Sequence, residues 1–272
     1  MNAQDNVAID RRAMLTMGAV ASLAMASAAE ATAVAPNSAA LRLHGRPLTA
    51  LDLTHKLTRA FAFTPGRLVM DPVEGSGAQA GMAMNRVCIV EHTGTHLDAP
   101  RHFSEQGATV GDLPIGQLIV PLCVVDIRAK VSKDRDARVI DADLRDWEKR
   151  HGRIPPGACV AMLAGWDPLA QMASYNRLAP TERGRSPGFD VSTIELLVAR
   201  DVRGIAVDTL SLDAGGSMPA YPFHQTWLRR GRWGLEAVTN LDRAPPAGGL
   251  LFAAVAPLDQ ATGAPARAIA IF

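Results

Sequence analysis

The sequence predicts an α/β fold in a single domain. Short, nearly continuous apolar runs bounded by turn residues are typical of strands covered on both faces, and they occur at 120–127, 158–163, 204–207, 250–255 and 268–272. Helix-forming segments lie between these runs, at 141–150 and 190–200. The 272 residues are 48% hydrophobic and no low-complexity linker divides them, so we expect one substantial core.

The first 35 residues differ from the rest of the chain. Arg11 and Arg12 precede a stretch rich in Ala, Gly, Ser and Met, and Ala-x-Ala sequences follow at 26–28 and 31–33. This order of charge, apolar residues and small residues is typical of a twin-arginine export signal, and the apolar part is too short to span a bilayer. The alternative is a disordered extension with two chance arginines. We expect a signal at 1–35, export by the twin-arginine machinery, and a periplasmic domain at 36–272.

The remaining elements follow in chain order. Residues 48–57 contain the apolar positions of a first strand, and a loop follows at 61–66. The helical segment at 141–150 is closed by Gly152. In the second helical segment, Ser192 and Glu195 have the spacing of a capping box. Residues 178–188, rich in Arg, Pro and Gly, predict a long surface loop or lid.

Charge and cysteine content exclude several classes of protein. Lys plus Arg number 28 and Asp plus Glu number 27, so the net charge is +1 and nucleic acid is not an expected partner. Cys88, Cys123 and Cys159 are widely spaced and lie in apolar runs. They therefore predict buried thiols, without a disulfide framework or a CxxC motif.

Residues 92–103, HTGTHLDAPRHF, contain three imidazoles and a carboxylate around a glycine and a proline. If residues 87–91 form a strand, His92 lies at its end, Gly94 allows a turn, and His96 and Asp98 point the same way at period two. His and Asp are ligands for divalent ions, so the spacing predicts a metal site. The alternative is that each His is a surface residue or a hydrogen-bonded core residue. Thr93 and Thr95 either donate to ligand carboxylates or simply favour the strand.

This segment resembles the HxGTHxDxPxHF motif of the cyclase family, which includes bacterial kynurenine formamidases and isatin hydrolases. His224 and Glu236, twelve residues apart, and the segment 204–213 resemble the family's second site segment. The resemblance runs from about residue 51 to residue 272. It implies the family's β/β/α arrangement, in which a curved central sheet is flanked by helices.

The resemblance also implies a site with two metals. His92, His96 and Asp98 would bind one ion, and His224 and Glu236 would hold a second, with Asp98 or Glu236 bridging. The donors are nitrogen and oxygen, so Zn²⁺ and Mn²⁺ both suit them, and Fe²⁺ or Co²⁺ stays open.

His102 corresponds to the family's general acid/base, which would work with metal-bound hydroxide; the alternative is that His102 only orients a ligand. Asp208 and Asp213 are expected to cap turns rather than to bind metal.

The activity implied by the resemblance is hydrolysis of a C–N amide bond, in an arylformamide or a cyclic amide such as N-formylkynurenine or isatin. Where kynurenine formamidases have Trp-Pro-Gly-Asp, this chain has Thr64-Pro65-Gly66-Arg67, which favours an acidic or differently shaped substrate. Alternatives are a lactone hydrolase, a cyclase or lyase, and a metal-dependent binding protein without turnover. Relatives imply a homodimer or a larger homo-oligomer. The aromatic residues expected near the site, as pocket wall or as ordinary core, are Phe61, Phe63, Trp166, Tyr221 and Phe223.

Overall fold

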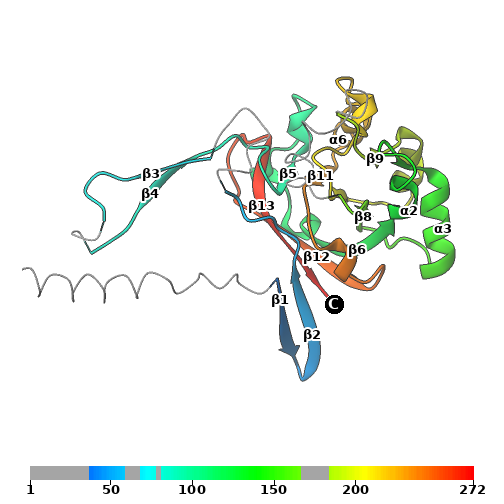
Figure 1. The fold of residues 1–272 in the computed structure, drawn as a ribbon, viewed down its shortest axis with the longest axis horizontal. Helices are drawn as coiled ribbons and strands as arrows, with labels where there is room; N and C mark the ends of the chain where they lie inside the picture. The colour runs from blue at the N-terminus through cyan, green and yellow to red at the C-terminus, as the bar shows by residue number, and fades with distance from the viewer. Residues whose placement is uncertain (1–36, 59–67, 78–80, 167–183) are drawn as a thin grey trace, which may run out of the picture. The chain divides into compact units, whose positions relative to one another are not determined.

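The structure is a computed structural model that describes residues 37–58, 68–77, 81–166 and 184–272 (Figure 1). The predicted export signal, the loop 61–66 with Arg67, and most of the loop 178–188 lie outside the described residues. Residues 37–272 form one compact unit, in agreement with the single predicted domain. Among the described residues, no helix is long and apolar enough to cross a membrane.

A curved sheet that closes on itself organises the described residues. Its strand order is β1-β2-β13-β12-β6-β8-β10-β11-β5, and an additional pairing of β13 with β5 joins the two sides. Closure leaves β1 and β2 as an extension on β13. Closing the sheet removes unpaired edges and encloses an interior that side chains fill.

One part of this sheet is parallel. Strand β8 pairs in parallel with β6 and with β10, and β10 pairs in parallel with β11. The bounds of these strands are Ile119–Asp126 for β6, Cys159–Leu163 for β8, Gly204–Val207 for β10 and Trp233–Glu236 for β11. Three of the four coincide with predicted apolar runs to within a residue, whereas β11 mixes Gly and Glu with apolar residues and was not predicted.

The other part is antiparallel. Strand β13 pairs with β12, β2 and β5, and β12 also pairs with β6. The bounds are Ser38–Leu43 for β1, Arg46–Asp52 for β2, His96–Asp98 for β5, Gly249–Val255 for β12 and Gly263–Ile271 for β13. Two small sheets complete the described strands: β3 (Val69–Pro72) with β4 (Asn85–Cys88), and β7 (Arg138–Val139) with β9 (Gly188–Phe189).

Two apolar cores lie on the two faces of the parallel strands. Along β6, Leu122 and Val124 join one core, whereas Cys123 and Val125 join the other. Alternate side chains of a strand point to opposite faces, so burial on both faces produces the continuous apolar runs seen in the sequence. The first core fills the interior of the closed sheet, and the second packs beneath the helices.

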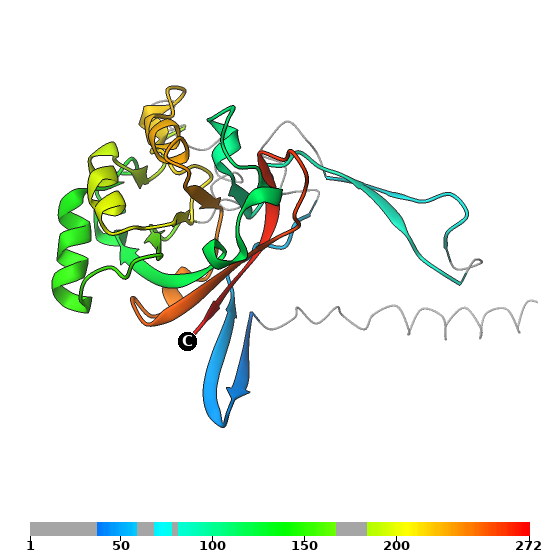
Figure 2. The same cartoon turned by 180° about the vertical axis from the view of Figure 1, so that it is seen from behind.

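The helices gather beside the parallel strands in both views (Figures 1 and 2). They are α2 (Arg128–Val131), α3 (Asp141–His151), α5 (Ile194–Ala199) and α6 (Pro222–Leu228). Helix α3 ends before Gly152, as predicted. The predicted capping box of Ser192 and Glu195 is wrong: the Asp190 carboxylate accepts the Ser192 N–H instead, because a short 3-10 turn precedes α5.

The expectation for the cysteines is partly wrong. Cys123 and Cys159 are buried in the two cores, but Cys88 is exposed at the end of β4. Strand β4 pairs only with β3 among the described strands, so its apolar residues have no sheet neighbour on the other edge.

Candidate metal centre

The pairing of β5 with β11 places a histidine opposite a glutamate. His96 of β5 lies directly across from Glu236 of β11, and Leu97 lies across from Leu235. Both leucines are buried in the core inside the closed sheet. Because side chains alternate along a strand, His96, Asp98 and Glu236 therefore project from the opposite face. All three are nearly fully buried.

The loop before β5 brings in His92. Gly94 has a φ of 68°, a left-handed conformation that glycine adopts at little cost, and this turn returns the chain toward β5. The Thr95 hydroxyl donates to the Ala237 carbonyl at 2.6 Å and accepts the His55 N–H at 2.9 Å. Thr95 thus ties β5 to the residue after Glu236 rather than donating to a ligand carboxylate.

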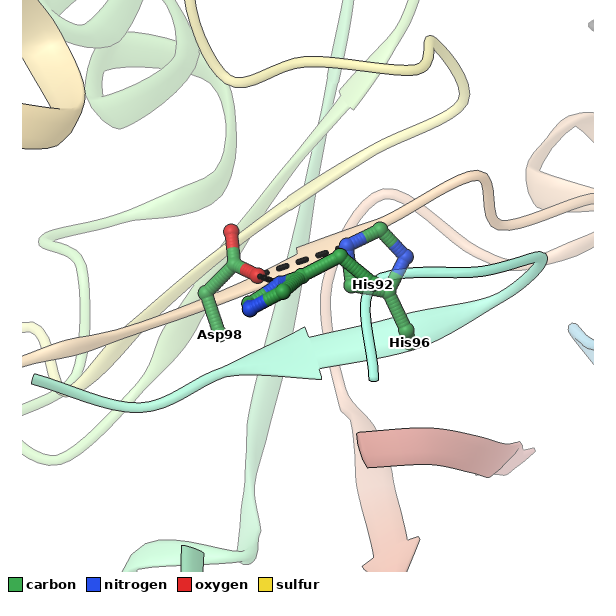
Figure 3. A group of neighbouring side chains, drawn as sticks. All are labelled: His92, His96 and Asp98. Atoms are coloured by element: carbon green, nitrogen blue, oxygen red, sulfur yellow. Dashed lines mark hydrogen bonds and ion pairs between the residues drawn. The ribbon is translucent and has the colours of Figure 1, made fainter. Parts of the chain in front are cut away.

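Asp98 lies at the centre of the first group of side chains. Its Oδ1 is 2.6 Å from His92 Nδ1 and 3.3 Å from His96 Nε2. Figure 3 shows both imidazoles directed at this carboxylate. One ligand atom from each of His92, His96 and Asp98 lies within 4.8 Å of the others, which is close enough to hold one ion.

The second group shares Asp98 with the first. Asp98 Oδ2 is 3.4 Å from His224 Nε2, and Glu236 Oε1 is 2.9 Å from the same nitrogen. Glu236 Oε2 faces the first group, at 3.4 Å from His96 Nε2. Asp98, His224 and Glu236 again lie within 4.8 Å of one another. Each carboxylate therefore turns one oxygen toward each group, an arrangement suited to bridging two ions.

A carboxylate that was not expected at the site orients His224. Asp213 accepts the His224 Nδ1–H at 2.6 Å and the backbone N–H groups of Phe223 and His224. His96 is oriented in the same way, since its Nδ1 donates to the Gly94 carbonyl at 2.8 Å. In both rings Nε2 then faces the carboxylates of the cluster. The turn-capping role predicted for Asp213 is thus incomplete.

The electrostatics of the cluster are those of a cation site. Burial opposes ionisation of Asp98, but the imidazoles of His224, His92 and His96 outweigh it and hold the pKa of Asp98 well below its ordinary value. Burial likewise opposes protonation of His96, but Asp98, Glu236 and the Gly94 carbonyl raise its pKa to about 9. The carboxylates thus draw positive charge to this position.

The residues fit a divalent metal. Asp98 Oδ2 is buried and accepts no hydrogen bond from any described residue, and its ion-pair contact with His224 Nε2 is as long as 3.4 Å. A buried carboxylate oxygen in this state is costly unless a cation contacts it. The five side chains offer imidazole nitrogen and carboxylate oxygen without thiolate. This donor set suits Zn²⁺ and Mn²⁺ alike.

His102 lies beside the cluster but belongs to neither group. It ends a 3-10 turn, Pro100–His102, and its ring stacks on His92 with centroids 3.9 Å apart and planes 28° apart. Burial lowers the pKa of His102 to about 4; the Asp98 carboxylate opposes this shift, and the imidazoles of His92, His224 and His96 add to it. A neutral imidazole at neutral pH can accept a proton.

A cavity of about 410 Å³ opens over the cluster, and its polar floor is formed by the ligand candidates and His102. The rest of its wall is largely apolar, with Val90, Phe103, Leu210, Met218 and Tyr221. Of the expected aromatic residues, Tyr221 lines the cavity, Phe223 is core, and Trp166 packs against the core beneath Arg135. Phe61 and Phe63 lie outside the described residues. Phe103 was not expected in the wall.

Comparison with known proteins identifies the family. Residues 51–214 match the family model described as putative cyclase. The chain belongs to the cyclase family. Among curated members, it is 34% identical to isatin hydrolase of Roseibium aggregatum over 70% of this chain and 74% of that protein. It is 31% identical to kynurenine formamidase of Paracidovorax citrulli over 71% of this chain and 82% of that protein.

Solved structures of cyclase-family proteins have the same fold. Isatin hydrolase A from Ralstonia solanacearum superimposes with a TM-score of 0.73 at 27% identity, covering 99% of both chains. Isatin hydrolase A from Labrenzia aggregata, bound to benzyl benzoate, gives the same TM-score at 26% identity, covering 94% of this chain and 98% of that one. The predicted family and α/β fold are confirmed, although the helices are few and short.

A further buried carboxylate, that of Asp208, belongs to neither group of ligand candidates. Asp208 follows β10 and accepts the backbone N–H groups of Ala164, Gly165 and Trp166 at 2.7–3.1 Å. Burial raises its pKa to about 7, against the effect of these donors. Asp208 therefore caps the turn after β8, which is a different turn from the one predicted beside Thr209.

Proposed function

We propose that this protein is a metal-dependent hydrolase of a C–N amide bond, with an arylformamide or a cyclic amide as substrate. The observation that carries the proposal is the convergence of His92, His96, Asp98, His224 and Glu236 at the floor of a cavity that also contains His102. The relatives named isatin hydrolase and kynurenine formamidase support an amide as the substrate.

Each of the five side chains has a stated place in the proposed centre. His92 and His96 would hold one ion and His224 the other, and Asp98 and Glu236 would serve both, since each presents one oxygen to each group. When bound, a divalent metal supplies the Lewis acidity that activates water and polarises a carbonyl. The buried position of the carboxylates keeps competing water from weakening these interactions.

His102 is proposed as the general acid/base. Its imidazole would take a proton from the attacking water and deliver it to the leaving nitrogen, which a group that is neutral at rest can do. Stacking on His92 holds the ring over the cluster. In the alternative role, His102 would only orient His92, and its removal would then weaken metal binding.

The apolar wall suits a planar aromatic substrate. Phe103 and Tyr221 lie with ring centroids 5.9 Å apart, and each contacts the His224 ring from the cavity side. Tyr221 has a φ of 47°, a strained conformation for a residue with a side chain, which occurs preferentially at functional sites. An aryl ring placed against these two side chains would direct its carbonyl toward the polar floor.

The experiment that tests this function is hydrolysis of isatin and N-formylkynurenine by metal-loaded protein, with a chelator control and product mass. Chelator-sensitive turnover with one added water supports an amide hydrolase. Conversion without added water would instead indicate a cyclase or lyase. Bound metal with no turnover of either amide would contradict the proposed substrate class, and a lactone assay would then separate a lactone hydrolase from a binding protein.

Export remains a proposal that rests on the sequence of residues 1–35. An exported enzyme would act in the periplasm on amides that arrive from outside the cell. Replacing Arg11 and Arg12 together by Lys should retain the protein in the cytoplasm, as measured by cell fractionation. Unchanged distribution would contradict twin-arginine export. A homodimer is likewise proposed, and light scattering of the purified protein would test it.

A further inference from the structure

His92 differs from the other two ligand histidines in what holds it. His96 and His224 are oriented by partners close in sequence or on a neighbouring loop, Gly94 and Asp213. His92 lies in the loop before β5, and its Nε2 is 3.0 Å from the hydroxyl of Thr262. Thr262 immediately precedes β13 and lies beyond the residues that match the family model.

Glu91 determines which way the Thr262 hydroxyl is directed. Glu91 Oε2 is 3.1 Å from the Thr262 backbone nitrogen and 2.5 Å from Thr262 Oγ1. A backbone N–H can only donate, so this carboxylate oxygen is an acceptor. The hydroxyl has one hydrogen, and it is donated to Glu91. Thr262 Oγ1 therefore accepts from His92, which places the hydrogen of the imidazole on Nε2.

We propose that Glu91 and Thr262 are positioning residues that keep a hydrogen on Nε2 of His92, so that Nδ1, which faces Asp98, is the nitrogen available to the proposed metal centre. His92 Nδ1 is 2.6 Å from Asp98 Oδ1, so the nitrogen that faces the cluster is the one that Thr262 does not contact. The hydrogen-bonded series Glu91–Thr262–His92 orients an imidazole, as the direct contact of Asp213 with His224 does, but here a hydroxyl lies between the carboxylate and the imidazole.

The packing of the His92 ring supports this role. A Cβ on Gly263 would lie 2.4 Å from His92 Cε1 and 2.8 Å from Nδ1, so only glycine fits beside the ring. The His102 ring stacks on His92 at 3.9 Å. Thr262 and Gly263 thus place a hydroxyl group and a residue without a side chain against the His92 imidazole. The start of β13, which also pairs with β5, thereby fixes the ring.

The inference rests on the proposed metal centre, and its test uses metal binding rather than turnover. Thr262→Val removes the hydroxyl at nearly constant volume, Thr262→Ser keeps it, and Glu91→Gln removes only the charge. Thr49→Val on β2 and Glu74→Gln are matched controls away from the cluster. The readouts are the Zn²⁺ dissociation constant by chelator competition, the absorption spectrum of the Co²⁺ form, and Tm of the metal-free protein.

We expect Thr262→Val to weaken Zn²⁺ binding by about 10- to 100-fold and to change the Co²⁺ spectrum, since partners that orient ligand histidines typically contribute this much. Thr262→Ser should restore both readouts to near the original values, and Glu91→Gln should weaken binding to a smaller degree. Glu91 is partly exposed, so Glu91→Gln tests the hydrogen-bonded series without disturbing the core.

Two different failures are distinguishable. In the first, the wild-type, Thr262→Val and Glu91→Gln proteins all bind Zn²⁺ equally tightly, and their Co²⁺ spectra are the same. This result would overturn the positioning role and leave the proposed function intact. Wild-type protein that binds no divalent metal would overturn the proposed function and this inference together.

Discussion

Asp213→Asn is the substitution whose effect can be worked out most fully from the structure. The Asp213 carboxylate receives three N–H donors: Nδ1 of His224 at 2.6 Å, the backbone N–H of His224 at 3.1 Å and that of Phe223 at 2.7 Å. An asparagine has one acceptor oxygen, and its amide nitrogen would face a donor. At least one buried N–H would lose its partner, and the His224 ring would no longer be held by a charge.

The magnitude follows from these contacts. A hydrogen bond to a charged group is worth about 1.5–3 kcal/mol, and loss of a partner that orients a metal-bound histidine typically costs about 10- to 100-fold in metal affinity. We therefore expect the Asp213→Asn protein to bind Zn²⁺ about 10- to 100-fold more weakly and to have a lower Tm. The increase in the pKa of His224 that Asp213 produces would also diminish.

The assay is chelator competition with metal-free protein, together with thermal unfolding. Asp259→Asn is the matched control, because Asp259 is exposed and far in sequence from the ligand candidates. If Asp213→Asn and Asp259→Asn bound Zn²⁺ with equal affinity, the orienting role of Asp213 would be refuted. A lower Tm of the Asp213→Asn protein with unchanged Zn²⁺ affinity would show that the Asp213 carboxylate stabilises the fold without orienting the metal site.

Three further predictions concern His102, Asp208 and the cysteines. His102→Gln should abolish turnover while the amount of bound metal, measured by elemental analysis, stays unchanged. The pKa of His102 is about 4 in the folded protein and about 6.5 in the unfolded chain, so the unfolded state takes up the proton first as pH falls. The wild type should therefore lose about 1–2 kcal/mol of stability relative to this variant between pH 6.5 and pH 4. Denaturant unfolding at both pH values measures this difference, and a gain in its place would contradict the sign. Asp208→Ala should destabilise the fold by about 1–3 kcal/mol, because three backbone donors lose their acceptor; an unchanged denaturation midpoint would exclude that role. Cys88 alone should react with a thiol reagent in the native protein, whereas burial raises the pKa of Cys123 to about 12 and shields Cys159; three fast-reacting thiols would contradict the packing of the core.

The local part of the candidate site could be predicted from sequence because its geometry is local. Gly94 and the period of two in β5 place His96 and Asp98 on one face, with Leu97 in the core, as the spacing indicated. The long apolar strands were equally predictable, since burial on both faces leaves a continuous run. His224 and Glu236 came only from the resemblance, and the pairing of β11 with β5 shows why they approach the motif.

What could not be predicted depends on contacts between distant segments. Asp213 precedes His224 by eleven residues, and Thr262 follows His92 by 170 residues, so no spacing rule connects them. The closure of the sheet through β13 and β5 is a tertiary pairing with no local signal. Thr95 lies just before β5 rather than in a strand, and the partner of its hydroxyl, the Ala237 carbonyl, becomes visible only when β5 and β11 are paired.

The measurement that tests the account most directly is titration of metal-free protein with Zn²⁺ or Mn²⁺ while amide hydrolysis and bound metal are recorded together. The arrangement of Asp98 and Glu236 between the two groups of side chains predicts that turnover rises with bound metal and saturates when the cluster is filled. It also predicts that Asp98→Ala, which removes a ligand candidate from both groups, loses metal and turnover together. Full hydrolytic activity in protein shown to contain no metal, or in the Asp98→Ala variant, would contradict the central claim.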